Sequence, residues 1–411
     1  MIDKIISFSI RHKLLVVIFT LLLIISGFIS LSKLPIDAVP DITNVQVQIL
    51  TKAPALGPVE VEEFITYPIE AAMNGLPDVE EIRSISRYGI SAVTVVFKEH
   101  VNIYFARQLV QERLIAAKES IPANFGSPAL GPATTGLGEI YHFTVDGKDY
   151  SPTELRTILD WEIGYRLRAV PGVVEVNAWG GLAKQFEVQV KPEKLIAYKI
   201  PLKQIFGAIS ENNSIVGSAG IERFQEQILI RGEGLIRDVH DLEEIVVAVR
   251  EKGTPIRVKD LATVKIGFLP RLGSATKDGQ GETVIGMVQM LVGENSREVA
   301  KRVDERIKEI QKTLPPGVKI RTFYDRTQLV DRTLHTVKQN LVEGGMLVMA
   351  ILFFVLGNFR AGLLVALVIP LSMLFAIAGM VMGKVSGNLM SLGAIDFGLI
   401  VDGAVIIVEN C

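Results

Sequence analysis

Three acidic residues lie in the apolar segment DFGLIVDGAVIIVEN (residues 396–410). Asp396, Asp402 and Glu409 stand among leucine, isoleucine and valine residues of the kind that membrane-spanning helices contain. At 100° per residue, Asp402 and Glu409 fall within about 20° of each other on a helix, whereas Asp396 lies about 120–140° away from both. Burial disfavours the charged form of a carboxyl group, so an acid at hydrocarbon depth can alternate between charged and neutral forms. These residues are therefore candidates for a proton relay.

The main alternative to a relay is a permanent ion pair with a basic residue of another helix. The apolar residues of this segment favour membrane insertion by about 5 kcal/mol, while its two aspartates oppose insertion by about 6 kcal/mol. The segment therefore needs other helices, water or charged partners beside its acids, and Gly393, Gly398 and Gly403 would let helices approach closely. The other apolar segments contain no Lys or Arg in their centres, so a basic partner would lie in sequence beyond this chain.

The composition predicts a membrane protein. Hydrophobic residues make up 49% of the 411 residues and the mean hydropathy is +0.36, which is too apolar for an ordinary soluble protein. Apolar segments that reach the roughly 18–25 residues needed to cross a bilayer cover residues 14–31, 341–357, 363–383 and the segment from 388 onward. The net charge of −2 gives no sign of the excess of basic residues that nucleic-acid-binding proteins have. The single cysteine, Cys411, excludes a disulfide framework within the chain.

The charges around the first apolar segment predict its orientation. The segment is too long for the apolar part of a cleaved signal peptide, and no A-x-A cleavage site follows it. Lys4, Arg11 and Lys13 precede it, so the positive-inside rule predicts a cytoplasmic N-terminus. Residues 34–340 then lie on the other side of the membrane.

The region between the first and second apolar segments has the patterns of an α+β body. NVQVQIL (44–50) and ISAVTVVF (90–97) contain strand-type residues, whereas residues 59–75 and 104–118 have helical spacing. A helix that leads to a turn and a strand occurs twice, about 94 residues apart, at 76–86 and 170–180. This internal repeat predicts two β-α-β-type units.

The second unit is interrupted by an insertion. Residues from about 182 to 271 contain short strands and Gly-rich turns of their own. The strand ETVIGMVQMLV (282–292) and the helix at 296–314 that follow are expected to supply the missing half of the second unit. The sequence PPGVKIRTFYD then supplies a last strand back toward the membrane.

GLGEIYHFTV (136–145) is the best local candidate for metal ligands, because the five histidines are scattered without an H-x-x-x-H pair. A Gly-rich loop brings Glu139 to the start of a strand, and His142 follows three residues later. Strand alternation places these two side chains on opposite faces, so they are not expected to hold the same ion. The alternatives are a solvated loop acid at Glu139 and a core or surface histidine at His142. A full O/N site needs further ligands.

On these motifs, the chain resembles the N-terminal half of a resistance–nodulation–division (RND) transporter. The resemblance is to the heavy-metal efflux branch of that family, and to its CzcA-like members in particular. The pattern D-F-G-x-x-x-D-G-A-x-x-x-V-E-N resembles the fourth-span motif of that branch, with Gly403 where drug pumps usually have a second aspartate. The segment from LPIDAVPDITN to MNGLP near the start is similar to the same branch. The resemblance covers essentially all 411 residues.

The resemblance implies an α+β membrane protein in which transmembrane helices carry ferredoxin-like βαβ porter subdomains and a docking insertion. It divides the chain into a first transmembrane helix (1–33), a first porter subdomain (34–133), a second porter subdomain (134–181 and 272–334), a docking-type insertion (182–271) and transmembrane helices two to four (335–411). It also implies a homotrimer in the inner membrane of a Gram-negative bacterium, with residues 34–340 in the periplasm. A periplasmic adaptor and an outer-membrane channel are the implied partners. Asp402 matches the family's relay aspartate, and Asp396 and Glu409 match the other two acids of the branch.

The favoured hypothesis is efflux of a divalent heavy-metal cation (zinc, cobalt, cadmium or nickel) by proton antiport, with no permanently bound cofactor. The absence of a G-x-x-x-x-G-K-[ST] motif favours an ion gradient over ATP as the energy source, and indicates a transporter rather than an enzyme. Acids rather than methionines in the last segment favour a borderline divalent ion over copper or silver. The alternatives are a multidrug or organic-solute pump on the same fold, and a truncated, transport-inactive fragment.

Overall fold

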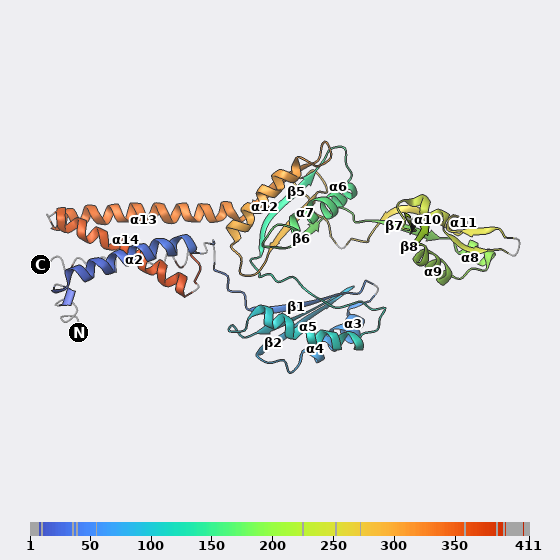
Figure 1. Cartoon of the computed structure of the whole chain (residues 1–411), viewed down its shortest axis with the longest axis horizontal. Helices are drawn as coiled ribbons and strands as arrows, with labels where there is room; N and C mark the ends of the chain where they lie inside the picture. Colours follow the sequence, from blue (N-terminus) through green and yellow to red (C-terminus); the bar gives the residue numbers. More distant parts are fainter. Residues whose placement is uncertain are drawn as a thin grey trace.

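The computed structural model describes residues 8–9, 11–34, 37, 40–54, 56–223, 226–250, 253–271, 273–356, 359–383, 385–388, 391 and 406. Figure 1 shows the long helices at one end, two units with a sheet each in the middle, and a smaller group of strands and helices at the far end. Asp396, Asp402 and Glu409 lie outside the described residues. The predicted proton relay therefore stays a prediction.

The long helices are α2 (Lys13–Lys33), α13 (Arg326–Leu356) and α14 (Phe359–Met382). Helix α14 packs against α2 at the buried Gly27, where a Cβ atom would lie 2.5 Å from Leu374 Cβ. Within the described part of the chain, Lys13–Ser32 is long and apolar enough to cross a membrane, and Pro370–Met382 is a shorter apolar helix. The described residues of the predicted second span lie in α13, and all but the last residue of the predicted third span lie in α14; their path through a bilayer stays a prediction.

The first unit consists of residues 45–130. Its elements are β1 (Val45–Lys52), α3 (Pro58–Val61), η1 (Glu62–Thr66), α4 (Tyr67–Met73), β2 (Val79–Arg87), β3 (Ile90–Phe97), α5 (Ile103–Ser120) and β4 (Ala129–Leu130). The sheet has the order β2-β3-β1-β4, and each neighbouring pair is antiparallel. Alternate strand residues such as Val47, Ile49 and Val95 are fully buried in one core with residues of the helices, so the alternation predicted here is confirmed.

The second unit repeats this design with strands from both sides of the insertion. Its elements are β5 (Glu139–Asp146), α6 (Pro152–Ile158), η2 (Leu159–Ile163), α7 (Gly164–Arg168), β6 (Val173–Trp179), β13 (Val284–Met290), α12 (Ser296–Gln311) and β14 (Lys319–Asp325). The sheet order is β14-β5-β13-β6, and β13 pairs with both β5 and β6. The predicted strand 282–292 therefore joins the sheet that β5 and β6 begin.

Both sheets follow the order of a β-α-β-β-α-β unit, with the first and third strands in the centre. The second long helix of each unit also begins in the same way. Asn102 accepts hydrogen bonds from the amides of Tyr104 and Phe105 at the start of α5, and Asn295 accepts them from Arg297 and Glu298 at the start of α12. The internal repeat predicted from the sequence is thus confirmed as a repeat of topology.

The first helix of each unit contains one π-helical turn that the periodicity did not predict. In the first unit, η1 ends two residues before Pro68, which has no amide hydrogen for the normal helical bond to Phe64. In the second unit, the amide of Gly164 donates to Leu159, and a Cβ on Gly164 would lie 2.9 Å from that same carbonyl oxygen. Local backbone constraints therefore widen both helices.

The insertion between β6 and β13 has a core of its own (Figure 1). Its elements are β7 (Lys184–Val190), α8 (Pro192–Tyr198), α9 (Leu202–Asn212), β8 (Ile215–Arg223), β9 (Glu226–Glu233), α10 (Val239–Glu244), β10 (Val246–Val249), β11 (Pro255–Arg257), α11 (Val258–Leu261) and β12 (Ala262–Phe268). The first and last strands, β7 and β12, pair with each other in antiparallel register. The chain therefore leaves and re-enters the second unit through one two-stranded ribbon.

Candidate functional site

Glu139 begins β5 directly after the Gly-rich loop, as the sequence predicts. The loop turns tightly there, because a Cβ on Gly138 would overlap the hydroxyl of Thr134. The amide of Gly138 donates to the carbonyl of Thr135 at 3.0 Å, and its carbonyl accepts from Met290 at 2.8 Å. These contacts fix the backbone from which Glu139 projects, and the Glu139 side chain stays half exposed.

The expectation that Glu139 and His142 occupy opposite faces is wrong. In the pairing of β5 with β13, Tyr141 lies opposite Val288 and Glu139 lies opposite Gln289, so Ile140 is an extra residue in β5. A β-bulge of this kind breaks the two-residue alternation. As a result, Glu139 Oε2 and His142 Nε2 approach to 3.6 Å on the same face of the sheet.

The His142 imidazole lies in a mostly apolar environment. Its side chain is 23% exposed and packs against the rings of Phe323 and Tyr324, with centroid distances of 5.7 and 5.0 Å. Burial lowers the pKa of His142 below its usual 6.5, and the nearby Glu139 carboxylate raises it by a smaller amount. The neutral imidazole, which is the form that binds metal ions, is therefore favoured. Its Nε2 atom is buried and has no hydrogen-bond partner.

A hydrogen-bond network on the other face of the sheet holds β5 in place. The hydroxyl of Tyr141, a fully buried residue, donates to Asp304 Oδ1 at 2.8 Å and lies 2.7 Å from the hydroxyl of Thr322. Burial raises the pKa of Tyr141, so this residue stays protonated. The network connects β5 to α12 and β14, and it rigidifies the strand segment that contains the Glu139–His142 pair.

The Glu139–His142 pair is incomplete as a metal site. Within the described ranges, no three His, Cys, Asp or Glu side chains are grouped closely enough to hold an ion. A carboxylate oxygen and a neutral imidazole nitrogen suit zinc and similar divalent ions, which take about four O/N ligands. The pair can thus supply two donors, and the remaining ligands must come from other side chains or from water.

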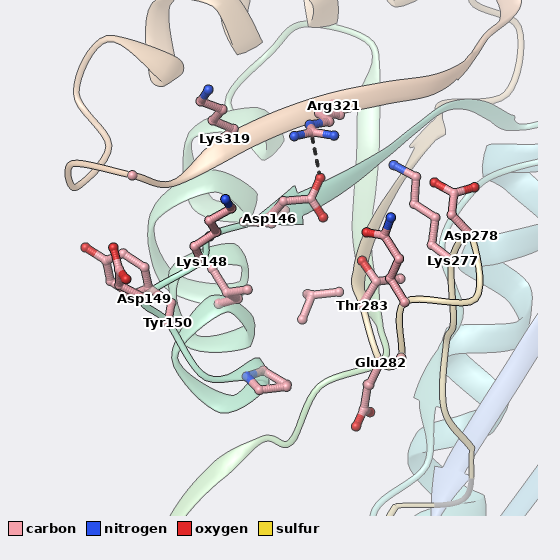
Figure 2. Close-up of a pocket in the computed structure, with 18 residues that line it drawn as sticks. Asp146, Lys148, Asp149, Tyr150, Lys277, Asp278, Glu282, Thr283, Lys319 and Arg321 are labelled. Atoms are coloured by element: carbon pink, nitrogen blue, oxygen red, sulfur yellow. Dashed lines mark ion pairs between the residues drawn. The ribbon is translucent and has the colours of Figure 1, made fainter.

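A cavity of about 760 Å³ lies elsewhere in the second unit (Figure 2). Its lining contains equal numbers of basic and acidic side chains, which are Lys148, Lys277, Lys319, Arg321, Asp146, Asp149, Asp278 and Glu282. Asp146 pairs with Arg321 at 3.4 Å, as the dashed line in Figure 2 marks, and Lys277 Nζ donates to Thr144 Oγ1 at 3.1 Å. Neither Glu139 nor His142 lines this cavity. This cavity is therefore separate from the Glu139–His142 pair.

A buried ion pair joins the second unit to the segment after α2, and the sequence analysis did not identify it. Arg326, whose side chain is only 4% exposed, donates from Nε and Nη2 to Asp37 Oδ1 at 3.0 and 2.8 Å. The amide of Asp37 donates to the carbonyl of Gly387 at 3.1 Å, beyond the end of α14. Arg326 Nη1 also lies 3.4 Å from the carbonyl of Leu137, two residues before Glu139. We call this ion pair and its hydrogen bonds the joint. It links Arg326 at the start of α13, Asp37 after α2 and Gly387 after α14 to the loop that positions Glu139.

Comparisons with known proteins agree with the motif resemblance. A model described as the AcrB/AcrD/AcrF family matches residues 5–411. The chain is 54% identical to protein HelA of Legionella pneumophila over 418 residues. It is 51% identical to the cobalt-zinc-cadmium resistance protein CzcA of Cupriavidus metallidurans over 420 residues. Each alignment covers 100% of the chain and 39% of the relative.

A solved structure is similar over nearly the whole chain. The X-ray crystal structure of a heavy metal efflux pump matches 98% of this chain and 41% of its own chain, with a TM-score of 0.87 and 37% sequence identity. The chain spans about two fifths of the length of these relatives. The resemblance to CzcA-like heavy-metal efflux RND transporters is confirmed, and the chain belongs to the AcrB/AcrD/AcrF family.

Proposed function

We propose that this chain is the N-terminal part of an inner-membrane pump that exports a divalent heavy-metal cation, zinc, cobalt, cadmium or nickel, by proton antiport. The observation that carries the proposal is the Glu139–His142 pair. It lies on the open face of the second unit's sheet, which is the face away from the core that Tyr141 and Val288 share with the helices. It presents one carboxylate and one neutral imidazole, separated by 3.6 Å, to a borderline divalent ion. The printed name of the CzcA relative, a cobalt-zinc-cadmium resistance protein, supports the same class of ion.

The proposal assigns the two kinds of acid to different tasks. Glu139 and His142 take part in binding the exported ion outside the membrane. Asp402 carries the coupling proton, and Asp396 and Glu409 assist it, as their match to the acids of the family's fourth-span motif suggests. In this proposal the first and second units are the porter subdomains 34–133 and 134–181 with 272–334, and residues 182–271 are the docking insertion.

The assembly follows the pattern of the RND family. The pump is a homotrimer in a Gram-negative inner membrane, with its N-terminus in the cytoplasm and residues 34–340 in the periplasm. It operates with a periplasmic adaptor and an outer-membrane channel. Lys4, Arg11 and Lys13, which stand before the apolar segment of α2, support this orientation.

Transport by the full-length protein in proteoliposomes tests the proposal. Under an imposed pH gradient, wild-type protein is expected to move zinc, cobalt, cadmium or nickel, and Asp402→Asn is expected to abolish transport while metal binding persists. Glu193→Gln, an exposed carboxylate of the insertion, is the matched control and is expected to transport at the wild-type rate. Undiminished transport of every ion by Asp402→Asn would remove Asp402 from the mechanism.

A further inference from the structure

The loop of residues 131–138 connects the two units and leads directly into Glu139. It lies between β4 and β5, and backbone hydrogen bonds tie its two ends to both sheets. The amide of Gly131 donates to the carbonyl of Gln48 in β1 at 2.7 Å, and the carbonyl of Gly138 accepts from an amide of β13 at 2.8 Å. The position of this loop therefore decides where the Glu139 side chain lies.

Two side chains from outside both units hold the middle of the loop. Thr43 Oγ1 accepts a hydrogen bond from the amide of Gly136 at 3.2 Å, and Arg326 Nη1 donates to the carbonyl of Leu137 at 3.4 Å. Thr43 belongs to the segment between α2 and β1, and Arg326 is the first residue of α13. Segments that adjoin the long helices thus hold the peptide groups just before β5.

The guanidinium group of Arg326 is one rigid link between Asp37 and Leu137. Its Nε and Nη2 atoms donate to Asp37, while Nη1 donates to Leu137. Because a guanidinium is planar and its nitrogen atoms keep fixed relative positions, a displacement of Asp37 turns Nη1 relative to Leu137. The Arg326 side chain is buried, so water does not readily replace either partner.

Asp37 connects this link to the ends of two long helices. It follows α2, and its amide donates to the carbonyl of Gly387, which follows α14. The two helices also pack closely on each other, at the contact between Gly27 and Leu374. A movement of α2 or α14 would therefore displace Asp37 and, through Arg326, the loop.

A small cavity beside the joint gives the loop room to move. Its volume is about 160 Å³, and Asp37, Leu137 and Ser386 are among the residues that line it. Close-packed interiors resist deformation, so free volume next to a contact permits a displacement that close packing would prevent. The loop can therefore follow a shift of Asp37 without displacing the core of the second unit.

We propose that Arg326 is a positioning residue for cation export, which holds the Leu137 carbonyl, and with it the Glu139 carboxylate, in a place set by the ends of α2 and α14. This inference rests on the proposed function and adds a residue that contacts neither the ion nor the coupling proton. A change at the helix ends alters the cation affinity of Glu139 through Arg326. By linkage, cation binding at Glu139 alters the helix ends.

A double-mutant cycle on the purified full-length protein tests this assignment. Isothermal titration with zinc chloride would compare the wild type with Arg326→Lys, Glu139→Gln and the double variant. Lysine keeps the charge but lacks the planar fork, so it cannot hold Asp37 and Leu137 together. Each single variant is expected to raise the Kd at least about fivefold, and the double variant is expected to match Glu139→Gln within about twofold, because Arg326 acts through Glu139.

Arg297→Lys is the matched control. Arg297 also pairs the second unit with α13, since its Nε donates to Asp331 Oδ1 at 2.9 Å, but this pair is exposed. Within the described part of the chain, neither residue of the pair hydrogen-bonds to the loop. The control is expected to bind zinc with the wild-type Kd.

Circular dichroism and gel filtration check that each variant folds. If Arg326→Lys does not fold, Asp37→Asn takes its place in the cycle, with the same expected result. It weakens the hold on the guanidinium with almost no change in the size of the side chain.

Transport tests the link to the helices. In proteoliposomes at saturating zinc and under an imposed pH gradient, Arg326→Lys is expected to transport at least about fivefold more slowly per folded protein than the wild type. A purely structural role would change the amount of folded protein but not this rate. A wild-type rate would overturn the link to the helices.

The outcomes separate this inference from the proposed function. Wild-type zinc affinity in Arg326→Lys, effects that add in the double variant, or equal weakening in Arg297→Lys overturns this inference but leaves the proposed function standing. Wild-type affinity in Glu139→Gln overturns this inference together with the proposed role of Glu139. A wild-type protein that binds none of zinc, cobalt, cadmium or nickel overturns the proposed function as well.

Discussion

The two sheets share one topology but differ in how the polar groups of their open faces are satisfied. On the first sheet, Arg83 Nη2 donates to Gln46 Oε1 at 3.1 Å, so the basic group and the amide satisfy each other across the strands. On the second sheet, His142 Nε2 and Gln289 Oε1 are buried without partners. A sheet face whose polar side chains hydrogen-bond to one another forms a structural surface. A face whose buried polar atoms have no hydrogen-bond partner is suited to binding a ligand.

On the core sides of the two sheets, different hydroxyl groups form the hydrogen bonds. In the first unit, the Thr66 hydroxyl of η1 lies 2.8 Å from the hydroxyls of both Ser86 and Ser91, so three hydroxyl groups hold the widened helix to the sheet. In the second unit, the Tyr141 network holds the bulged strand instead. Each unit thus uses buried hydroxyl groups to stabilise its own irregular element.

The largest expected effect concerns the joint between the second unit and the helices. Arg326→Met is expected to destabilise the full-length protein by about 3 kcal/mol, because it removes two charge-assisted hydrogen bonds from the buried guanidinium to Asp37 Oδ1. Arg326→Lys should cost less, since it keeps the charge. Chemical denaturation in detergent measures the free energy of unfolding of both variants. A loss under about 1 kcal/mol for Arg326→Met would show that the pair contributes little to holding the unit in place.

The hydroxyl cluster of the first unit gives the next largest effect. Thr66→Val is expected to cost roughly 1–3 kcal/mol, because the Ser91 hydroxyl is buried and loses its partner. Thr94→Val is the control, since Thr94 is partly exposed on the open face of the same sheet. The same denaturation experiment compares the two. Equal losses in both variants would contradict a special role for the cluster.

A pH-dependent difference is expected on the second sheet alone. The pKa of His142 is below 6.5 in the folded protein, so the stability that its neutral form contributes is present above pH 6.5 and is lost as the pH falls through the folded pKa. Zinc affinity should fall over the same range, because a protonated imidazole cannot bind the ion. Titrations between pH 5 and 7.5 should show a steeper fall for wild type than for His142→Gln. Identical pH profiles would exclude His142 as a ligand.

The smallest effect is a predicted absence of change on the first sheet. Glu81 lies on the open face of that sheet, one row from Arg83, and is opposite Val96. Glu81→Gln is expected to change the zinc Kd by less than about twofold, because this face offers no unpaired imidazole beside the acid. Calorimetry measures the change. A tenfold weakening of zinc binding would mean that both sheets contribute to cation binding. It would contradict the proposed difference between their open faces.

Much of the fold follows from local patterns in the sequence. The alternation in residues 44–50 and 90–97 predicts β1 and β3, and the helical spacing at 104–118 predicts α5, because strand and helix periodicities differ. The repeat and the return of the chain at 282–292 are also visible in sequence. The π-helical turns are not, because one extra residue in a turn barely alters the apolar pattern.

What the sequence by itself determined is the class of the protein: its long apolar segments, its two repeated units and the motifs of its family. Only the tertiary structure decided which side chains meet. Glu139 and His142 share a face because β13 pairs with β5 around a bulge, and Arg326 meets Asp37 across 289 positions in the chain. Periodicity is encoded within a few neighbouring residues, whereas register and long-range pairing depend on how distant segments pack, and a single strand does not specify them.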